Sequence, residues 1–192
     1  MTIRRLKDSV QDFTRLADRS GTDPEAMIQG GREILGRLIA QDDWLPDFAT
    51  VPHEQYYRQY LLHCDPLERF SIVSFVWGPG QKTPIHDHTV WGLVGMLRGE
   101  ERSRRFERNG TGLTEAGIER LRPGEIDVVS PTHGDIHQVA NAIEDRPSIS
   151  IHVYGANIGQ VSRNVYDAET GQAKPFVSGY NSEFVPNIWS MQ

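Results

Sequence analysis

Two histidines separated by a single residue, His86 and His88, are the residues whose spacing points most directly to chemistry. Alternate side chains of a β-strand share one face, and their Cα atoms lie roughly 6.6 Å apart. If this segment is a strand, two imidazoles at that separation can bind one metal ion, while Asp87 points the other way and is a poor ligand. An isolated pair of this kind is more often structural, so its neighbours in the sequence decide its meaning.

The glycines around this pair give it a context. Gly80 lies six residues before His86, and Gly99 lies eleven residues after His88. This spacing resembles the first sequence motif of the cupin family. A second segment, residues 131–141, resembles the second cupin motif, with its proline, glycine, histidine and asparagine in the expected order and one additional residue between the first two.

The resemblance implies a third metal ligand, His137, which closure of a barrel would bring to the first two histidines. His133 is the rival ligand, and we favour His137 because it lies in the motif and begins an alternating segment. His53 and His63 have no motif context and are interpreted as surface or half-buried imidazoles. The glutamate that usually completes a cupin site would fall at Gly92. Three neutral imidazoles would leave the full charge of the ion for an anionic ligand, but they also suit zinc, so they do not name the metal.

A second cluster lies in the alternating segment 148–155. As a strand, this segment would place Ser150, His152 and Tyr154 on one face and apolar side chains on the other. A half-buried sheet face often has this pattern, so the alternation alone leaves a structural role open. The functional interpretation is a relay, in which the serine hydroxyl orients the imidazole and the imidazole engages the phenol.

Together these segments resemble the thiol dioxygenases of the cysteine dioxygenase type I family, within the cupins. The resemblance extends over residues 55–167. It implies a reaction in which a small thiol and dioxygen give a sulfinic acid, and it implies no organic cofactor. It also implies one iron(II) ion per chain, with three histidine ligands and an outer hydrogen-bonded triad: His86, His88 and His137, and Ser150, His152 and Tyr154.

Two positions depart from the family and bear on the substrate. Gln59 stands where mammalian-type members have the arginine that holds the substrate carboxylate, and Gly92 stands where they have the cysteine that crosslinks to the tyrosine. Cys64, the only cysteine, lies in another region, so we expect no thioether on Tyr154. Both departures resemble the bacterial branch that prefers 3-mercaptopropionate, in which an arginine at the position of Arg163 takes the carboxylate. The resemblance thus implies Arg163 and Tyr154 as substrate-binding residues, with Gln59 lining the pocket.

The sequence leaves three other functions open. L-Cysteine could be the main substrate of the same reaction. The chain could be a non-catalytic, small-molecule-binding cupin, although that reading predicts the loss of a histidine or of the Ser-His-Tyr face, and neither is lost. It could also be a zinc- or manganese-dependent isomerase built on the same barrel.

The composition argues against several classes of protein. The 192 residues are 38% hydrophobic and 24% charged, which is typical of a soluble globular chain with one core. No apolar run approaches the ~20 residues of a membrane span, and we expect no signal peptide at the charged N-terminus. A net charge of −6 without a basic cluster argues against nucleic acid as a partner. The single cysteine fits a cytoplasmic location.

The elements that must position these residues follow from the apolar period. Steps of three and four residues predict a helix over residues 3–17, and Asp23 and Pro24 mark the start of a second helix that reaches Ile39. A shorter turn around Trp44 would continue their packing. These elements are interpreted as structural cover.

From residue 55 the period changes to that of strands, separated by glycine and proline turns. Many short strands of this kind predict a sandwich or barrel. We therefore expect an all-β (mainly β) fold, with a single cupin jelly-roll β-barrel at 55–178, an N-terminal helical layer at 1–48 and a tail at 179–192 packed on the barrel. The expected strands are 55–63, 69–77, one around His86, 90–97, 101–108, 126–129 and 148–154, with a last hairpin of 161–166 and 173–177.

Overall fold

The computed structural model describes residues 3–21, 23–110 and 112–189. Two helices open the chain, α1 (Arg4–Ser20) and α2 (Pro24–Ile39), as their apolar period predicts. The Asp23 side chain caps α2 by accepting a hydrogen bond from the Glu25 N–H, and Pro24 takes a position where no backbone N–H is needed. Neither helix has the combination of length and apolarity needed to cross a membrane.

Strands form two antiparallel sheets within the described residues. The first has the order β1-β2-β9-β4-β7 and the second the order β11-β10-β3-β8-β5-β6. This arrangement confirms the expected all-β barrel with N-terminal helices. The bounds are β1 (Arg58–Cys64), β2 (Ser71–Trp77), β3 (Ile85–His86), β4 (Gly92–Arg98), β5 (Glu101–Asn109), β6 (Gly112–Leu121), β7 (Ile126–Val129), β8 (His137–Asn141), β9 (Ser148–Tyr154), β10 (Arg163–Tyr166) and β11 (Ala173–Phe176), with short 3-10 helices η1 (Asp47–Thr50) and η2 (Ile158–Gln160).

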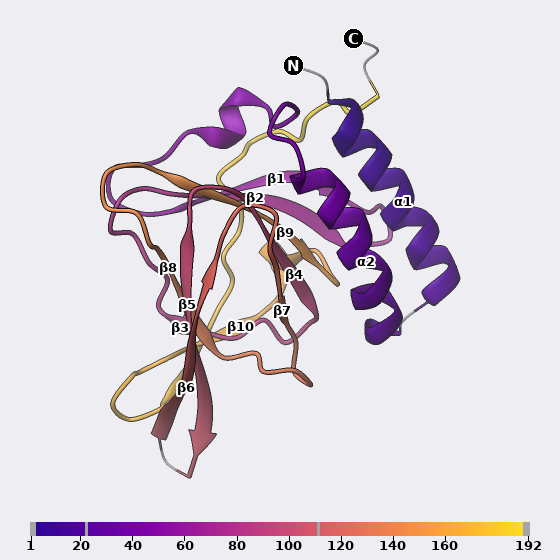
Figure 1. The fold of residues 1–192 in the computed structure, drawn as a ribbon. Coiled ribbons are helices and arrows are strands. Elements are labelled where there is room, and N and C mark those ends of the chain that lie inside the picture. Colours follow the sequence, from indigo (N-terminus) through magenta and orange to yellow (C-terminus); the bar gives the residue numbers. More distant parts are fainter. Residues whose placement is uncertain (1–2, 22, 111, 190–192) are drawn as a thin grey trace.

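The helices cover the outer face of the first sheet, where α1 and α2 lie side by side (Figure 1). Strand β9, at the centre of that sheet, is buried on both faces because the helices cover one face and the barrel interior is the other. Its alternate residues Ile149, Ile151 and Val153 belong to the apolar core shared with the helices. Ser150, His152 and Tyr154 therefore point into the barrel, as the alternation predicts.

Several strands differ from the prediction. β3 contains only Ile85 and His86, so His88 lies in the loop that follows rather than on the same strand. Thr89 has a φ of 60°, in the left-handed region, and turns the chain at that point. β1 begins at Arg58 and not at residue 55. β6 was not predicted, because both of its faces are largely exposed and the sequence has no apolar alternation there.

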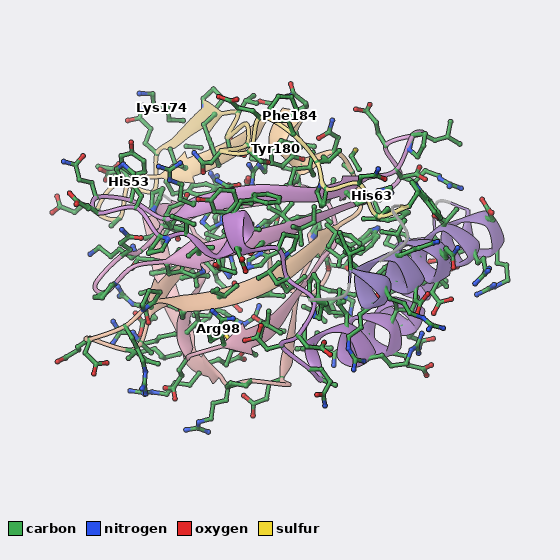
Figure 2. The ribbon with its side chains drawn as sticks, turned by 90° about the horizontal axis from the view of Figure 1, so that it is seen from above. His53, His63, Arg98, Lys174, Tyr180 and Phe184 are labelled. Carbon is green, nitrogen blue, oxygen red and sulfur yellow. The ribbon has the colours of Figure 1, made fainter. Side chains whose placement is uncertain are left out.

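The C-terminal segment contacts the free edge of the first sheet. The Asn181 N–H donates to the Gln59 carbonyl at 2.8 Å, and the Gln59 N–H donates to the Asn181 side chain at 2.7 Å. The Leu61 N–H donates to the Ser182 hydroxyl at 2.9 Å. Figure 2 shows this segment, marked by Tyr180 and Phe184, running over β1. Residues 1–2 of the expected helical layer and 190–192 of the expected tail lie outside the described residues.

Candidate metal centre

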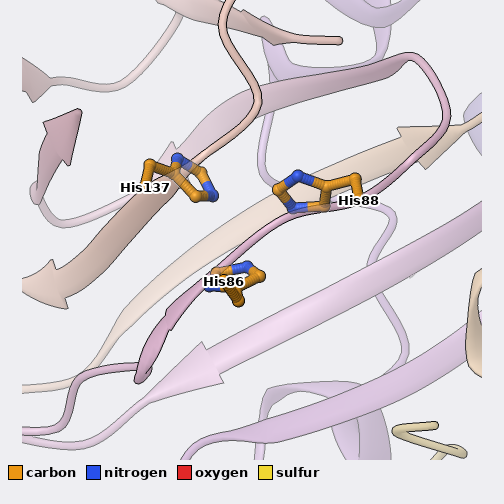
Figure 3. Close-up of side chains that lie close together, drawn as sticks. All are labelled: His86, His88 and His137. Atoms are coloured by element: carbon orange, nitrogen blue, oxygen red, sulfur yellow. The ribbon is translucent and has the colours of Figure 1, made fainter. Parts of the chain in front are cut away.

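Three buried histidines converge inside the barrel, and we refer to them as the three-histidine cluster: His86, His88 and His137 (Figure 3). One ligand nitrogen of each ring lies within 4.8 Å of those of the other two. Strand pairing produces part of this arrangement, since His86 in β3 is the direct register partner of His137 in β8. Burial lowers the pKa of His86 to about 3 and places the pKa of His137 well below its usual value. Both rings are therefore neutral, which is the form that binds metal.

Each of the three rings has its Nδ1 atom engaged by a different outer group. The Pro84 carbonyl accepts from His86 at 3.1 Å, and Ser103 Oγ lies 3.2 Å from Nδ1 of His137. Asp135 Oδ1 lies 2.8 Å from Nδ1 of His88. The carbonyl and the carboxylate can only accept a hydrogen bond, and the Ser103 hydroxyl can also accept one, so each ring can carry its proton on Nδ1 and keep the Nε2 lone pair free for a metal ion. The donor set fits a divalent transition-metal ion.

Asp135 also fixes the loop after β3. Its Oδ2 atom accepts hydrogen bonds from the backbone N–H groups of His88 and Thr89, at 3.0 and 2.8 Å. Burial alone would raise the pKa of Asp135, but these bonds and the one to the imidazole hold it below its usual range. Asp135 lies two residues before His137, within the second motif, but its role is not predicted from the sequence.

The other histidines lie outside the cluster. Nδ1 of His133 is 3.0 Å from the hydroxyl oxygens of Ser130 and Thr132 and 3.4 Å from a carboxylate oxygen of Glu25. His53 and His63 are well separated from each other in Figure 2. The structure therefore brings together the three histidines chosen from the sequence and leaves the rival, His133, in a loop.

Ser150, His152 and Tyr154 of β9 form the hydrogen-bonded relay expected from the sequence. Ser150 Oγ lies 2.8 Å from Nε2 of His152, and Nδ1 of the same ring lies 2.7 Å from the Tyr154 hydroxyl. The Trp77 indole N–H donates to Ser150 Oγ at 3.3 Å. Burial places the pKa of His152 well below its usual value and that of Tyr154 above it, so both are neutral. The Tyr154 ring stacks on His88 with centroids 5.4 Å apart, which places the relay beside the three-histidine cluster.

Gly92 lies directly against this phenol ring. It is the register partner of Tyr154, and a Cβ atom added to it would approach two ring carbons at 2.7 and 2.8 Å. Neither a fourth metal ligand nor a cysteine sulfur is available at this position. Cys64, the remaining candidate for a thioether, lies in β1 and its thiol donates to the Asp65 carbonyl at 3.6 Å.

Arg163 is a buried cation with few partners. It is 4% exposed, and its Nη2 atom donates to the Ser178 hydroxyl at 2.6 Å while its Nε atom has no hydrogen-bond partner among the described residues. The guanidinium packs on the Phe176 ring at 4.7 Å. Burial lowers the pKa of Arg163, and the nearby phenol oxygens of Tyr154 and Tyr57 oppose that shift. A guanidinium remains charged in proteins, so this site favours an anion.

Asp87 holds the strand that presents this arginine. It points away from the three-histidine cluster, as expected, and its carboxylate accepts from the Asn164 backbone N–H at 2.8 Å and from the Asn164 amide at 2.9 Å. The Tyr166 hydroxyl donates to the same carboxylate at 2.6 Å. These bonds join the chain after β3 to β10, next to Arg163.

Gln59 has a less direct position. It is the register partner of Phe75, whose ring stacks on His152 with centroids 4.0 Å apart. The residue is 9% exposed, and its Oε1 atom has no hydrogen-bond partner among the described residues. Its side chain therefore faces the same side of the sheet as the relay.

Comparison with known proteins gives a family model that matches this chain. The model described as cysteine dioxygenase type I matches residues 40–168. The chain is 23% identical over 120 residues to cysteine dioxygenase type 1 of Bos taurus, covering 60% of this chain and 58% of that protein. It is 24% identical over 129 residues to the protein of the same name from Homo sapiens, covering 64% of this chain and 63% of that protein. The match thus spans about three fifths of the length of these relatives.

Solved structures resemble the chain more weakly. A protein with a double-stranded β-helix domain from Klebsiella pneumoniae has a TM-score of 0.47 at 19% identity, covering 62% of this chain and 95% of that one. A cupin superfamily protein from Desulfitobacterium hafniense has a TM-score of 0.44 at 17% identity, covering 61% of this chain and 94% of that one.

Proposed function

Because the chain belongs to the cysteine dioxygenase type I family, we propose that it is a non-haem iron(II) thiol dioxygenase acting on a small thiol carboxylate. In this reaction one thiol and one dioxygen molecule give one sulfinic acid, and both oxygen atoms end on sulfur. The observation that carries the proposal is the proximity of three groups: the three-histidine cluster, the relay, and the buried Arg163 guanidinium, whose charge acts on both His86 and Tyr154.

The metal ligands in this proposal are His86, His88 and His137. Iron(II) bound there would supply a redox-active centre with positions for a thiolate and for dioxygen. No carboxylate belongs to the ligand set, so the imidazoles leave the charge of the ion for an anionic thiolate to balance. Coordination to a cation lowers the pKa of a thiol, which favours that anion.

The relay residues hold a proton beside the reacting atoms. The Tyr154 hydroxyl lies next to the cluster, and His152 and Ser150 fix its position from behind. Because the pKa of Tyr154 is raised by burial, its hydroxyl keeps its proton at neutral pH and can donate a hydrogen bond. The Tyr57 and Trp77 rings stack with centroids 4.7 Å apart, in the same apolar cluster as the Tyr154 ring.

The substrate that fits best is 3-mercaptopropionate. Arg163 supplies one buried positive charge, and the carboxylate of this thiol would neutralise it with one negative charge. Tyr154 would assist, and Gln59 would line the pocket without adding charge. L-Cysteine is the alternative, because the free Oε1 atom of Gln59 could accept a hydrogen bond from its ammonium group. A thiol substrate also favours a cytoplasmic location, where thiols stay reduced.

Oxygen uptake tests the activity and the substrate together. The anaerobically iron-loaded protein is supplied with 3-mercaptopropionate, L-cysteine and cysteamine in parallel, and the sulfinic acid is measured by mass spectrometry. We expect one oxygen molecule consumed per thiol, fastest with 3-mercaptopropionate and slowest with cysteamine, which has no carboxylate. Absence of a sulfinic acid from all three thiols would contradict the proposed reaction.

Substitution of Arg163 tests the carboxylate site. Arg163→Ala removes the buried cation, so we expect KM for 3-mercaptopropionate to rise by about 10-fold to 100-fold, and the rate with cysteamine to change little. Gln59→Ala is the matched comparison and should have the smaller effect on KM. Steady-state kinetics in which only the glutamine change raises KM for the acid would overturn the assignment.

A further inference from the structure

Glu101 is a buried acid that the proposed mechanism does not use. It opens β5 and is 2% exposed, and neither of its carboxyl oxygens has a hydrogen-bond partner of ordinary geometry among the described residues. Burying an acid in this way is costly, so such a group in a native fold calls for an explanation. The next inward-facing residue of β5, Ser103, contacts His137, which places this face of the strand along the candidate site.

The Glu101 carboxyl lies near Ser150, at the end of the relay opposite Tyr154. The hydroxyls of Ser150 and Ser148 and the Trp77 indole N–H are the donors close enough to lower its pKa, but burial outweighs them and raises the pKa of Glu101 to about 8. The Ser148 hydroxyl has no hydrogen-bond partner of its own in the described chain. The unpartnered Ser148 hydroxyl and the unpartnered Glu101 carboxyl thus lie together behind Ser150.

Other charged groups near Glu101 are already paired. Glu101 lines a cavity of about 20 Å³ together with Glu119 of β6, Asp127 of β7 and His137 of β8. Arg105 forms ion pairs with both of these acids. A cavity of that size holds roughly one water molecule, so an ionised Glu101 would have little solvent to stabilise it.

The hydrogens of the relay allow two arrangements. Ser150 Oγ already accepts from Trp77 and has a single hydrogen to donate. If Glu101 is neutral and donates to Ser150, the serine hydrogen goes to Nε2 of His152. Nδ1–H then donates to the Tyr154 oxygen, and the tyrosine hydrogen is free to point at the three-histidine cluster.

An ionised Glu101 would reverse every bond. The carboxylate would attract the serine hydrogen, and Ser150 would then accept from Nε2–H of His152. Nδ1 of the imidazole would become an acceptor and would take the hydrogen of the Tyr154 hydroxyl. The phenol could then only accept a hydrogen bond from the substrate side.

We propose that Glu101 is a positioning residue that sets the direction of the Ser150–His152–Tyr154 relay, and so decides whether the Tyr154 hydroxyl donates toward the three-histidine cluster. The effect on catalysis rests on the proposed function, in which that hydroxyl donates to the substrate. The direction of the relay itself is a property of the protein without substrate.

The pH profile of kcat for Glu101→Gln tests the catalytic effect. In the unsubstituted protein, kcat should fall as the pH rises through the pKa of Glu101, because the relay reverses. Glutamine cannot ionise and can donate to Ser150, so the variant should keep its neutral-pH kcat within about threefold and lack that fall. Glu107→Gln, at an exposed position of the same strand, should keep the original profile. An unchanged alkaline fall in Glu101→Gln would overturn the proposal.

Infrared difference spectroscopy of the metal-free protein gives a readout independent of activity. Raising the pH should remove a carboxylic acid C=O band and shift a tyrosine C–O band with the same midpoint. Both changes should be missing in Glu101→Gln, and the tyrosine change in Tyr154→Phe. Glu101→Met replaces the glutamine variant if the latter does not fold. If the two bands change together but the protein oxidises no thiol, the proposed function is wrong and the role of Glu101 stands. If the tyrosine band does not move, the role of Glu101 is wrong.

Discussion

At the residue scale, Nδ1 of each histidine in the three-histidine cluster has its own partner outside the cluster, which constrains the ring as strongly as a metal ion on Nε2 would. The three Nδ1 atoms meet a backbone carbonyl, a carboxylate and a hydroxyl, so each ring has one favoured orientation. Outer partners of this kind fix the tautomer and direction of a metal ligand. Asp135 constrains its histidine more than the carbonyl and the hydroxyl do, because it also accepts a hydrogen bond from the His88 backbone N–H.

Asp135→Asn is expected to weaken metal binding by about 10-fold to 100-fold. The carboxylate uses one oxygen for the imidazole and the other for two backbone N–H groups, and the amide would present an N–H to one of these donors. Competition with a chromogenic chelator measures the affinity. Asp145→Asn, on an exposed loop, is the control and should bind like the original protein. Equal affinity in both variants would mean that Asp135 does not orient His88.

The histidines themselves could be predicted from sequence, but their partners could not. His86, His88 and His137 stand in two recognisable motifs, and the alternation on β9 was enough to place the relay. Asp135 lies inside the second motif, but its importance, like that of Glu101, depends on which loop or strand folds over it. Contacts between residues distant in the sequence leave no local pattern.

At the element scale, the short strand β3 holds together the two strands that contribute His137 and Arg163. β3 has two residues, yet it lies between β8, which contributes His137, and β10, which contributes Arg163. Because β3 ends at His86, His88 lies in a loop and not on the same strand. The expectation that one strand places both histidines was therefore wrong, although the two rings do converge. The exposed strand β6 was missed because a sheet edge with two solvated faces needs no apolar period.

Asp87→Ala should loosen the junction between β3 and β10. It removes the acceptor of three hydrogen bonds, each worth about 1 kcal/mol, so the melting temperature should fall by several degrees. We also expect KM for 3-mercaptopropionate to rise by about 10-fold, because Arg163 loses its support, while metal content stays the same. Calorimetry, kinetics and metal analysis measure the three quantities.

Glu169→Ala is the control for that change, since it lies at an exposed position in the turn of the same hairpin. It should leave KM and the melting temperature close to those of the original protein. A fall in melting temperature for Asp87→Ala without a change in KM would restrict Asp87 to a structural role.

At the scale of the whole molecule, the cluster joins segments that are distant in the chain. His86 and His137 come from neighbouring strands of the second sheet, and the relay comes from the centre of the first. Sequence patterns predicted the helices and most strands, but not the order β1-β2-β9-β4-β7, because pairing between distant strands depends on global packing. A metal ion bound at the cluster would therefore be linked to the stability of the complete barrel.

Metal removal should lower the melting temperature of the protein. A ligand that binds only the folded chain at 100 times its dissociation constant adds about 2.7 kcal/mol, or roughly 5 to 10 °C for a chain of this size. Thermal melts with iron(II), with zinc(II) and with a strong chelator measure the shift. His137→Ala should show no shift between these conditions. A shift that persists in that variant would place the stabilising ion elsewhere.

Gly92 has a consequence for the chemical uniformity of the protein. Gly92 has no side chain, and the single cysteine of the sequence lies in β1, so no thiol lies beside the Tyr154 phenol to form a thioether with it. We therefore expect every newly synthesised molecule to have the same tyrosine, with no slow thioether formation that would divide a preparation into early and late forms. Reaction progress curves should start at full speed and show no lag, however young the sample.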